Sequence, residues 1–117
     1  FAKFLQKRGE IIIKSWAEGF KGWNKNKLLR LTQDYFKKEH YKRIYDGAKE
    51  LIEFLKRKNY YVVGISRAFE DCLIPLQKYL SISLVIGTKF EYKNEICTGN
   101  LLNKMWEAGA KEKELMN

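Results

Sequence analysis

Residues 60–71 read YYVVGISRAFED and place a serine and an arginine directly after a run of β-branched and aromatic residues. Such a run predicts a buried strand, and a helical pattern follows it. Because the first turn of a helix has unpaired N–H groups, the junction of a strand with a helix favours an anion. The hydroxyl of Ser66 and the guanidinium of Arg67 can add donors to such a site. Ser66 can instead be an ordinary helix N-cap, and both interpretations stay open from this stretch alone.

The elements that must position this junction are predicted from apolar periodicity. Helices are expected on either side of Gly9, over 28–36, from 46 onward and over 69–80 and 110–116. The run SLVIGT over 83–88 predicts a second strand, and the alternating segment 89–100 predicts a hairpin that turns at Lys93 and Asn94. Helix, strand, helix and strand alternate from 47 to 88, which predicts an α/β fold with parallel strands.

Composition excludes several classes of protein. The chain has 117 residues, 45% of them hydrophobic and 32% charged, which is typical of a soluble domain and not of a disordered one. No apolar run approaches the roughly 18 residues of a membrane span. Cys72 and Cys97 match no metal-binding spacing and the chain has a single histidine, so no metal ligands are assigned. Two free thiols indicate a cytoplasmic protein.

The net charge of +9 lies entirely in residues 1–58 and favours a phosphate-bearing partner of some kind. A basic nucleic-acid-binding module is one alternative, because aromatics are interleaved with lysines in this half. These aromatics fall on apolar helical stripes, where core packing is expected: Trp16, Trp23, Tyr35 and Tyr41. A membrane-surface helix around 11–23 is a weaker alternative, because it carries Glu10 and Glu18. Nucleic acid and membrane are therefore not the expected partners.

Five features in order over about 60 residues resemble one family. A helix leads to a strand that ends in serine, a helix with an internal proline follows, then a strand reading VIGT, and then a charged hairpin that closes on Thr98-Gly99. The stretch GAKELIEFLKRKNYYVVGISRAFEDCLIPLQKYLSISLVIGTKFEYKNEICTGNLL thus looks like the middle of a haloacid-dehalogenase-type phosphatase, of the subgroup that contains phosphoserine phosphatases.

The resemblance implies a fold and a reaction. Residues 1–44 match in position the helical cap of these enzymes, and residues 45–117 match part of their Rossmann-like core. The implied reaction is Mg²⁺-dependent hydrolysis of a small phosphorylated substrate through an aspartyl-phosphate. Its loose transition state needs positioning and positive charge more than covalent chemistry.

Three residues carry roles over from the family. Ser66 matches the second motif, a hydroxyl that binds the transferring phosphoryl oxygens, and Arg67 stands where many members have glycine. Lys111 best matches the third-motif lysine that neutralises charge, because it lies four residues before the apolar Leu115; Lys113 and Lys104 are rivals.

Two family motifs are missing from these residues. The first motif, Asp-x-Asp-x-Thr, supplies the nucleophile and the general acid, and no Asp-x-Asp occurs in the sequence. The acidic fourth motif, which would ligate Mg²⁺, is missing too. We expect the sequence to be the interior of an enzyme, with the 117 residues alone not a competent catalyst. A catalytically inactive remnant of the family is the alternative.

Overall fold

The structure, a computed structural model, describes residues 2–116 and the side chains of residues 7–116. Its elements, with η for a 3-10 helix, are α1 (Ala2–Gly19), α2 (Lys25–Lys38), η1 (His40–Arg43), α3 (Ala48–Arg57), β1 (Val63–Phe69), η2 (Glu70–Leu73), α4 (Ile74–Leu80), β2 (Leu84–Thr88), β3 (Phe90–Lys93), β4 (Ile96–Leu101) and α5 (Ala110–Met116). The α/β fold class predicted from the sequence is confirmed.

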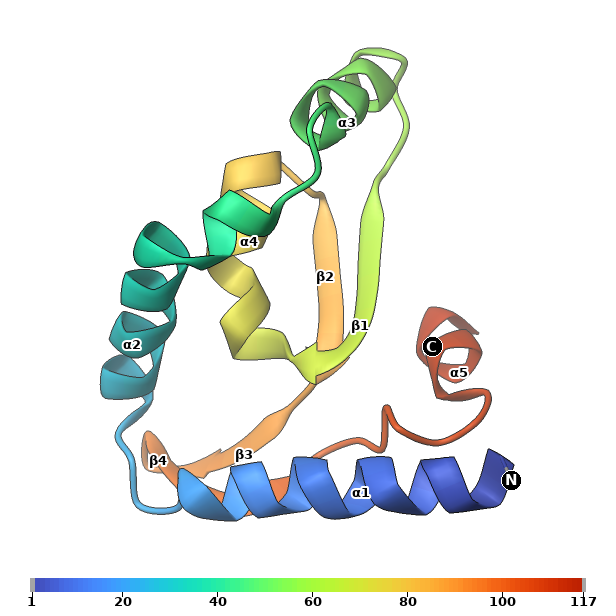
Figure 1. Ribbon diagram of the computed structural model, residues 1–117. Helices are drawn as coiled ribbons and strands as arrows, with labels where there is room; N and C mark the ends of the chain where they lie inside the picture. The colour runs from blue at the N-terminus through green and yellow to red at the C-terminus, as the bar shows by residue number, and fades with distance from the viewer. Residues whose placement is uncertain (1, 117) are drawn as a thin grey trace.

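The strands form two small sheets. β1 and β2 pair in parallel, and β3 and β4 form the antiparallel hairpin that the alternating pattern predicted. In Figure 1, η2 and α4 lie between the parallel pair and α2, α5 lies on the other side of β1, and α1 runs beneath the hairpin. The carboxyl ends of β1 and β2 therefore point toward the hairpin and α1.

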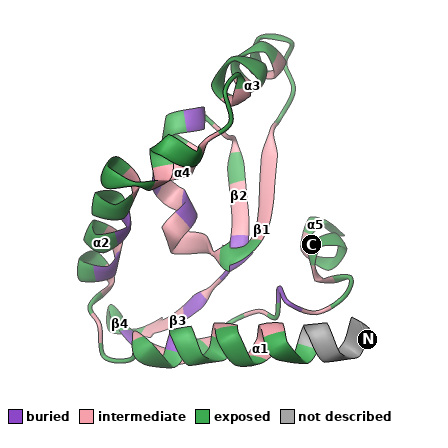
Figure 2. Cartoon of the chain, viewed as in Figure 1, coloured by how far each residue is buried: buried purple, intermediate pink, exposed green. Residues whose placement is uncertain are grey.

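The best-buried cluster lies where α1, α2 and the hairpin meet (Figure 2). It consists of Ala17, Leu28, Phe90 and Cys97, and the ring of Phe69 at the end of β1 stacks on Phe90 with centroids 4.3 Å apart. Residues from both 1–44 and 45–117 thus share one core. The division into a cap and a core domain stays a prediction.

The first helix differs from the expectation. A break at Gly9 was expected, whereas α1 is continuous from Ala2 to Gly19. A glycine inside a helix costs only about 1 kcal/mol, and here a Cβ on Gly9 would lie at ordinary contact distance, 3.7 Å, from Trp106 Cβ. Ile12 and Trp16 are more than half exposed, so the expectation that Trp16 packs into the core is wrong, whereas Ala17 of the same helix is buried there.

Tyr35 and Tyr41 are also less buried than their spacing predicted, since both are exposed, whereas Trp23 is half-buried and packs against the core. The helix expected over 28–36 is α2, and Asn24 is its N-cap, because the Asn24 side chain accepts a hydrogen bond from the Asn26 N–H. Within the described part of the chain, no helix is long and apolar enough to cross a bilayer.

Candidate phosphoryl-binding site

Ser66 lies within β1, three residues before the last residue of the strand, Phe69. The strand was expected over 60–66 but runs from Val63 to Phe69, and the short helix that follows is a 3-10 turn before α4. Pro75 lies in the first turn of α4, where its missing N–H leaves no intrahelical bond unmade. The α-helix that follows Ser66, α4, thus begins later in the sequence and is shorter than expected, and Ser66 is not its N-cap.

The strand bulges at Ser66. Ile65 pairs with Ile86 and Phe69 pairs with Thr88, so three residues of β1, 66–68, lie opposite the single residue Gly87 of β2. Bulges re-aim side chains and are frequent beside active sites. This bulge is at the carboxyl ends of two parallel strands, where α/β proteins bind their ligands.

Two hydroxyl groups hold the bulge in shape. The Ser66 Oγ accepts a hydrogen bond from the Ala68 N–H at 3.0 Å, and the buried Thr88 Oγ1 donates to the Arg67 carbonyl at 2.7 Å. Because Ser66 Oγ is an acceptor in the first bond, its own proton is available to donate outward. The Arg67 side chain is exposed at the same turn. The structure therefore places a hydroxyl donor and an exposed arginine on consecutive residues of the bulge.

Gly87 allows β2 to approach the bulge. A Cβ at this position would lie 2.6 Å from the Ala68 carbonyl oxygen and 2.9 Å from two backbone atoms of Glu70. The Gly87 N–H donates to the Glu70 Oε1 at 3.2 Å, which adds a second link between the two strand ends. Sequence reasoning recognised the VIGT strand but did not identify its glycine as a contact of the bulge.

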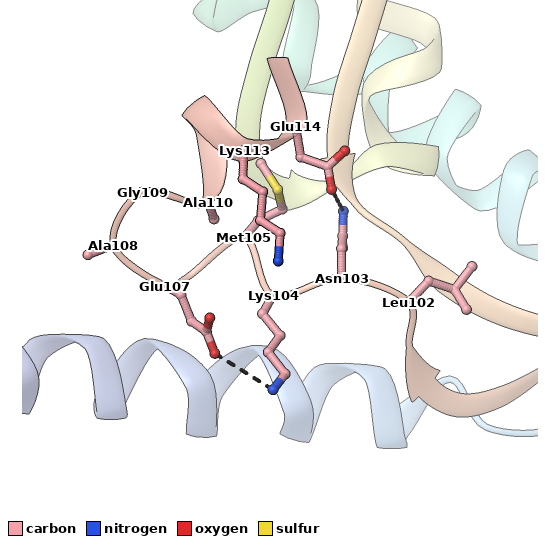
Figure 3. Close-up of a pocket in the computed structure, with 10 residues that line it drawn as sticks. All are labelled: Leu102, Asn103, Lys104, Met105, Glu107, Ala108, Gly109, Ala110, Lys113 and Glu114. Atoms are coloured by element: carbon pink, nitrogen blue, oxygen red, sulfur yellow. Dashed lines mark hydrogen bonds and ion pairs between the residues drawn. The ribbon is translucent and has the colours of Figure 1, made fainter. Parts of the chain in front are cut away.

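The three candidate lysines are placed differently (Figure 3). Lys104 and Lys113 both line a cavity of about 350 Å³ together with Asn103 and Glu114, whereas Lys111, on the same helix α5 as Lys113, does not line it. Lys104 forms an ion pair with Glu107 at 3.8 Å. No hydrogen bond or ion pair among the described side chains joins any of these lysines to Ser66. The choice among them stays open.

A second polar pair links η2 to the hairpin. The Tyr92 hydroxyl donates to the Asp71 carboxylate at 2.5 Å, and burial together with this bond raises the pKa of Tyr92 far above its usual range. Burial, and then the charge of Asp71, raises the pKa of the neighbouring Cys72 thiol to about 11. Both cysteines are free, with Cys97 buried and Cys72 partly so.

Cys72 is expected to react slowly with iodoacetamide at neutral pH. The thiolate is the reactive form, so a pKa near 11 leaves about 0.1% of it at pH 8, against roughly a quarter for an ordinary thiol. The rate of alkylation at Cys72, followed by mass spectrometry of its peptide, should keep rising with pH to about 11. A rate that reaches its plateau near pH 8.5 would contradict this.

The described residues do not fit a Mg²⁺ site. No group of three His, Cys, Asp or Glu side chains among them is placed to hold a metal ion. The two acidic residues that follow the bulge in the sequence, Glu70 and Asp71, accept hydrogen bonds from Gly87 and Tyr92 respectively. No step of chemistry is therefore assigned to a metal here.

Comparisons with known proteins agree with the resemblance. A curated phosphoserine phosphatase from Campylobacter jejuni subsp. doylei is 40% identical over 53 residues, which is 45% of this chain and 26% of that protein. No protein-family model matches the chain.

Among solved structures, a phospho-aspartyl intermediate analogue of phosphoserine phosphatase aligns with a TM-score of 0.59 and 21% identity over 89% of this chain and 46% of that one. A phosphoserine phosphatase from T. onnurineus in complex with NDSB-201 gives a TM-score of 0.49 and 23% identity over 82% and 43%. The first of these likenesses shows the fold, and this chain spans less than half the length of the proteins it matches.

Proposed function

Because the chain is phosphoserine phosphatase-like in sequence and in fold, we propose that the protein containing these residues is a phosphomonoesterase. Its substrate is a small phosphorylated molecule, and the phosphoryl group passes through an aspartyl-phosphate. The nucleophilic aspartate and the ligands of Mg²⁺ are not among the described residues. Lys111 and Lys113 remain the two candidates on α5 for the lysine that neutralises phosphoryl charge.

The observation that carries this proposal is the bulge at residues 66–68. Ser66 Oγ is oriented by the Ala68 N–H at the carboxyl end of β1, so its proton can donate to a phosphoryl oxygen without reorganisation. Arg67 extends from the same turn into solvent and can meet either the phosphoryl group or a second anion of the substrate. Charge spread over the phosphoryl oxygens is what such donors stabilise.

Ser66→Ala is expected to lower kcat for phosphomonoester hydrolysis by about a hundredfold, the usual loss when one oriented donor is removed. The full-length protein is assayed for release of phosphate from phosphoserine and from other small phosphomonoesters. Each assay is run once with added Mg²⁺ and once with EDTA. Ser66→Thr keeps a hydroxyl and should retain most of the activity. Ser15→Ala, an exposed serine on α1, is the control and should leave kcat unchanged.

Two results would overturn the proposal. One is a wild-type protein that hydrolyses no phosphate monoester under any of these conditions. The other is a Ser66→Ala variant whose kcat stays within about twofold of wild type, because the bulge then contributes no donor to the reaction.

A further inference from the structure

Asn103 joins two parts of the molecule that are far apart in the sequence. Its side-chain oxygen accepts a hydrogen bond from the Lys89 N–H at 2.9 Å, and its amide nitrogen donates to the Gly87 carbonyl at 2.9 Å. The same nitrogen lies 3.4 Å from the Glu114 Oε1 on α5 (Figure 3). One half-buried amide thus binds both the end of β2 and the helix that carries Lys111 and Lys113.

The β2 end of this contact leads directly to Ser66. The backbone of Gly87 is hydrogen-bonded on both sides: its N–H donates to Glu70, and its carbonyl accepts from Asn103. Gly87 itself packs against the Ala68 carbonyl in the bulge. Because these contacts leave no free space, a shift of the Asn103 amide is transmitted to the residues that orient the Ser66 hydroxyl.

The α5 end of the contact matters because α5 has little else to fix it. It has seven residues, none of them buried, and a helix of this length is not stable by itself. The position of its lysines therefore depends on the tertiary contacts of the helix, which include the hydrogen bond between Asn103 and Glu114.

We propose that Asn103 is a positioning residue that holds the lysine-bearing helix α5 in register with the Ser66 bulge. This inference rests on the proposed phosphatase function. It is specific to an amide, because only an amide both accepts from Lys89 and donates to Gly87 and Glu114. A carboxylate of the same shape keeps the acceptor, loses both donors and places a like charge beside Glu114.

Asn103→Asp is accordingly the informative variant, made in the complete protein. We expect kcat to fall by about tenfold to a hundredfold with little change in KM, since misplacing a group by about 1 Å costs rate and not ground-state binding. Asn100→Asp is the matched control: Asn100 is exposed on β4, three residues away, and should behave as wild type. Urea unfolding of both variants checks that each is folded under the assay conditions.

A double-mutant cycle separates positioning from general loss of stability. The α5 lysine used for the cycle is Lys111 or Lys113, whichever lowers kcat more when it is replaced by alanine. With that lysine already removed, Asn103→Asp should lower kcat by a clearly smaller factor than it does in the wild type, because the part of its effect that acts through the lysine is gone. If the two losses multiply, or if Asn103→Asp alone has wild-type kcat, the inference is overturned.

Amide hydrogen exchange gives a readout that does not depend on activity. Asn103→Asp should speed exchange both at Lys89 and in α5, and Asn100→Asp should not. A wild-type protein without phosphatase activity would overturn the proposed function. Unchanged exchange in α5 of the Asn103→Asp variant would overturn the link itself, whatever the activity.

Discussion

Gly87→Ala is expected to lower the free energy of unfolding by about 3 kcal/mol or more, because added volume in a packed site forces the backbone apart. The new Cβ would lie 2.6 Å from the Ala68 carbonyl oxygen and 2.9 Å from the backbone of Glu70. No side-chain rotation relieves these contacts, since the atoms belong to the backbone. β1 and β2 must therefore separate at their carboxyl ends, where the Ser66 bulge lies.

The same substitution should affect the proposed activity more than stability alone explains. Moving Ala68 away from β2 also moves the N–H that orients Ser66 Oγ, so the folded fraction of Gly87→Ala should show a kcat at least tenfold below wild type. Urea unfolding measures the first effect, and kinetics well below the unfolding midpoint measure the second.

Gly64→Ala is the matched control within the same pair of strands. Gly64 is in β1, but a Cβ there would meet Ile82 and Val85 no closer than 3.8 Å, which is ordinary contact. This change should be neutral or stabilise the protein by up to about 1 kcal/mol, because it reduces the entropy of the unfolded chain. Equal effects of Gly64→Ala and Gly87→Ala would contradict the close approach at Gly87.

Much of the α/β segment could be predicted because its signals are local. The hairpin was found from the alternation of its residues, although its turn lies at Asn94 and Glu95, one residue later than expected. The helix α5 was placed over Ala110–Met116 from its helical pattern. The resemblance identified Ser66 as a candidate site residue, because it lies at the expected place in a series of five features that follow one another along the chain. One sequence was therefore enough to find them.

The bulge could not be predicted because it depends on contacts across strands. Gly87 reads as an ordinary strand glycine until Ala68 and Glu70 are placed against it. Asn103 gave no signal at all, since its three partners are 11, 14 and 16 residues away. The same limit explains why Trp16 was wrongly expected to be buried. Helical spacing shows which residues share a face of a helix, but not whether another element covers that face.

Phe90→Ala should cost about 3–5 kcal/mol of unfolding free energy, the range for truncating a buried aromatic. Phe90 is 4% exposed, and its ring stacks on the ring of Phe69. It also makes T-shaped contacts with the rings of Phe20 and Tyr92. It therefore links the end of β1 to the helical half and the hairpin at once. Since small domains have about 5–15 kcal/mol in total, this loss is a large share of the stability.

The test of Phe90→Ala is a comparison with Phe54→Ala in the same urea experiment. Phe54 is 47% exposed on α3, so its truncation should cost about 1 kcal/mol or less. If the shared core unites residues 1–44 with residues 45–117, Phe90→Ala should shift one cooperative transition seen by both tryptophan fluorescence and far-UV circular dichroism. A Phe90→Ala variant as stable as Phe54→Ala would mean that the helical half and the strands do not depend on this core. The helices would then unfold as a separate unit, as expected of an independent cap.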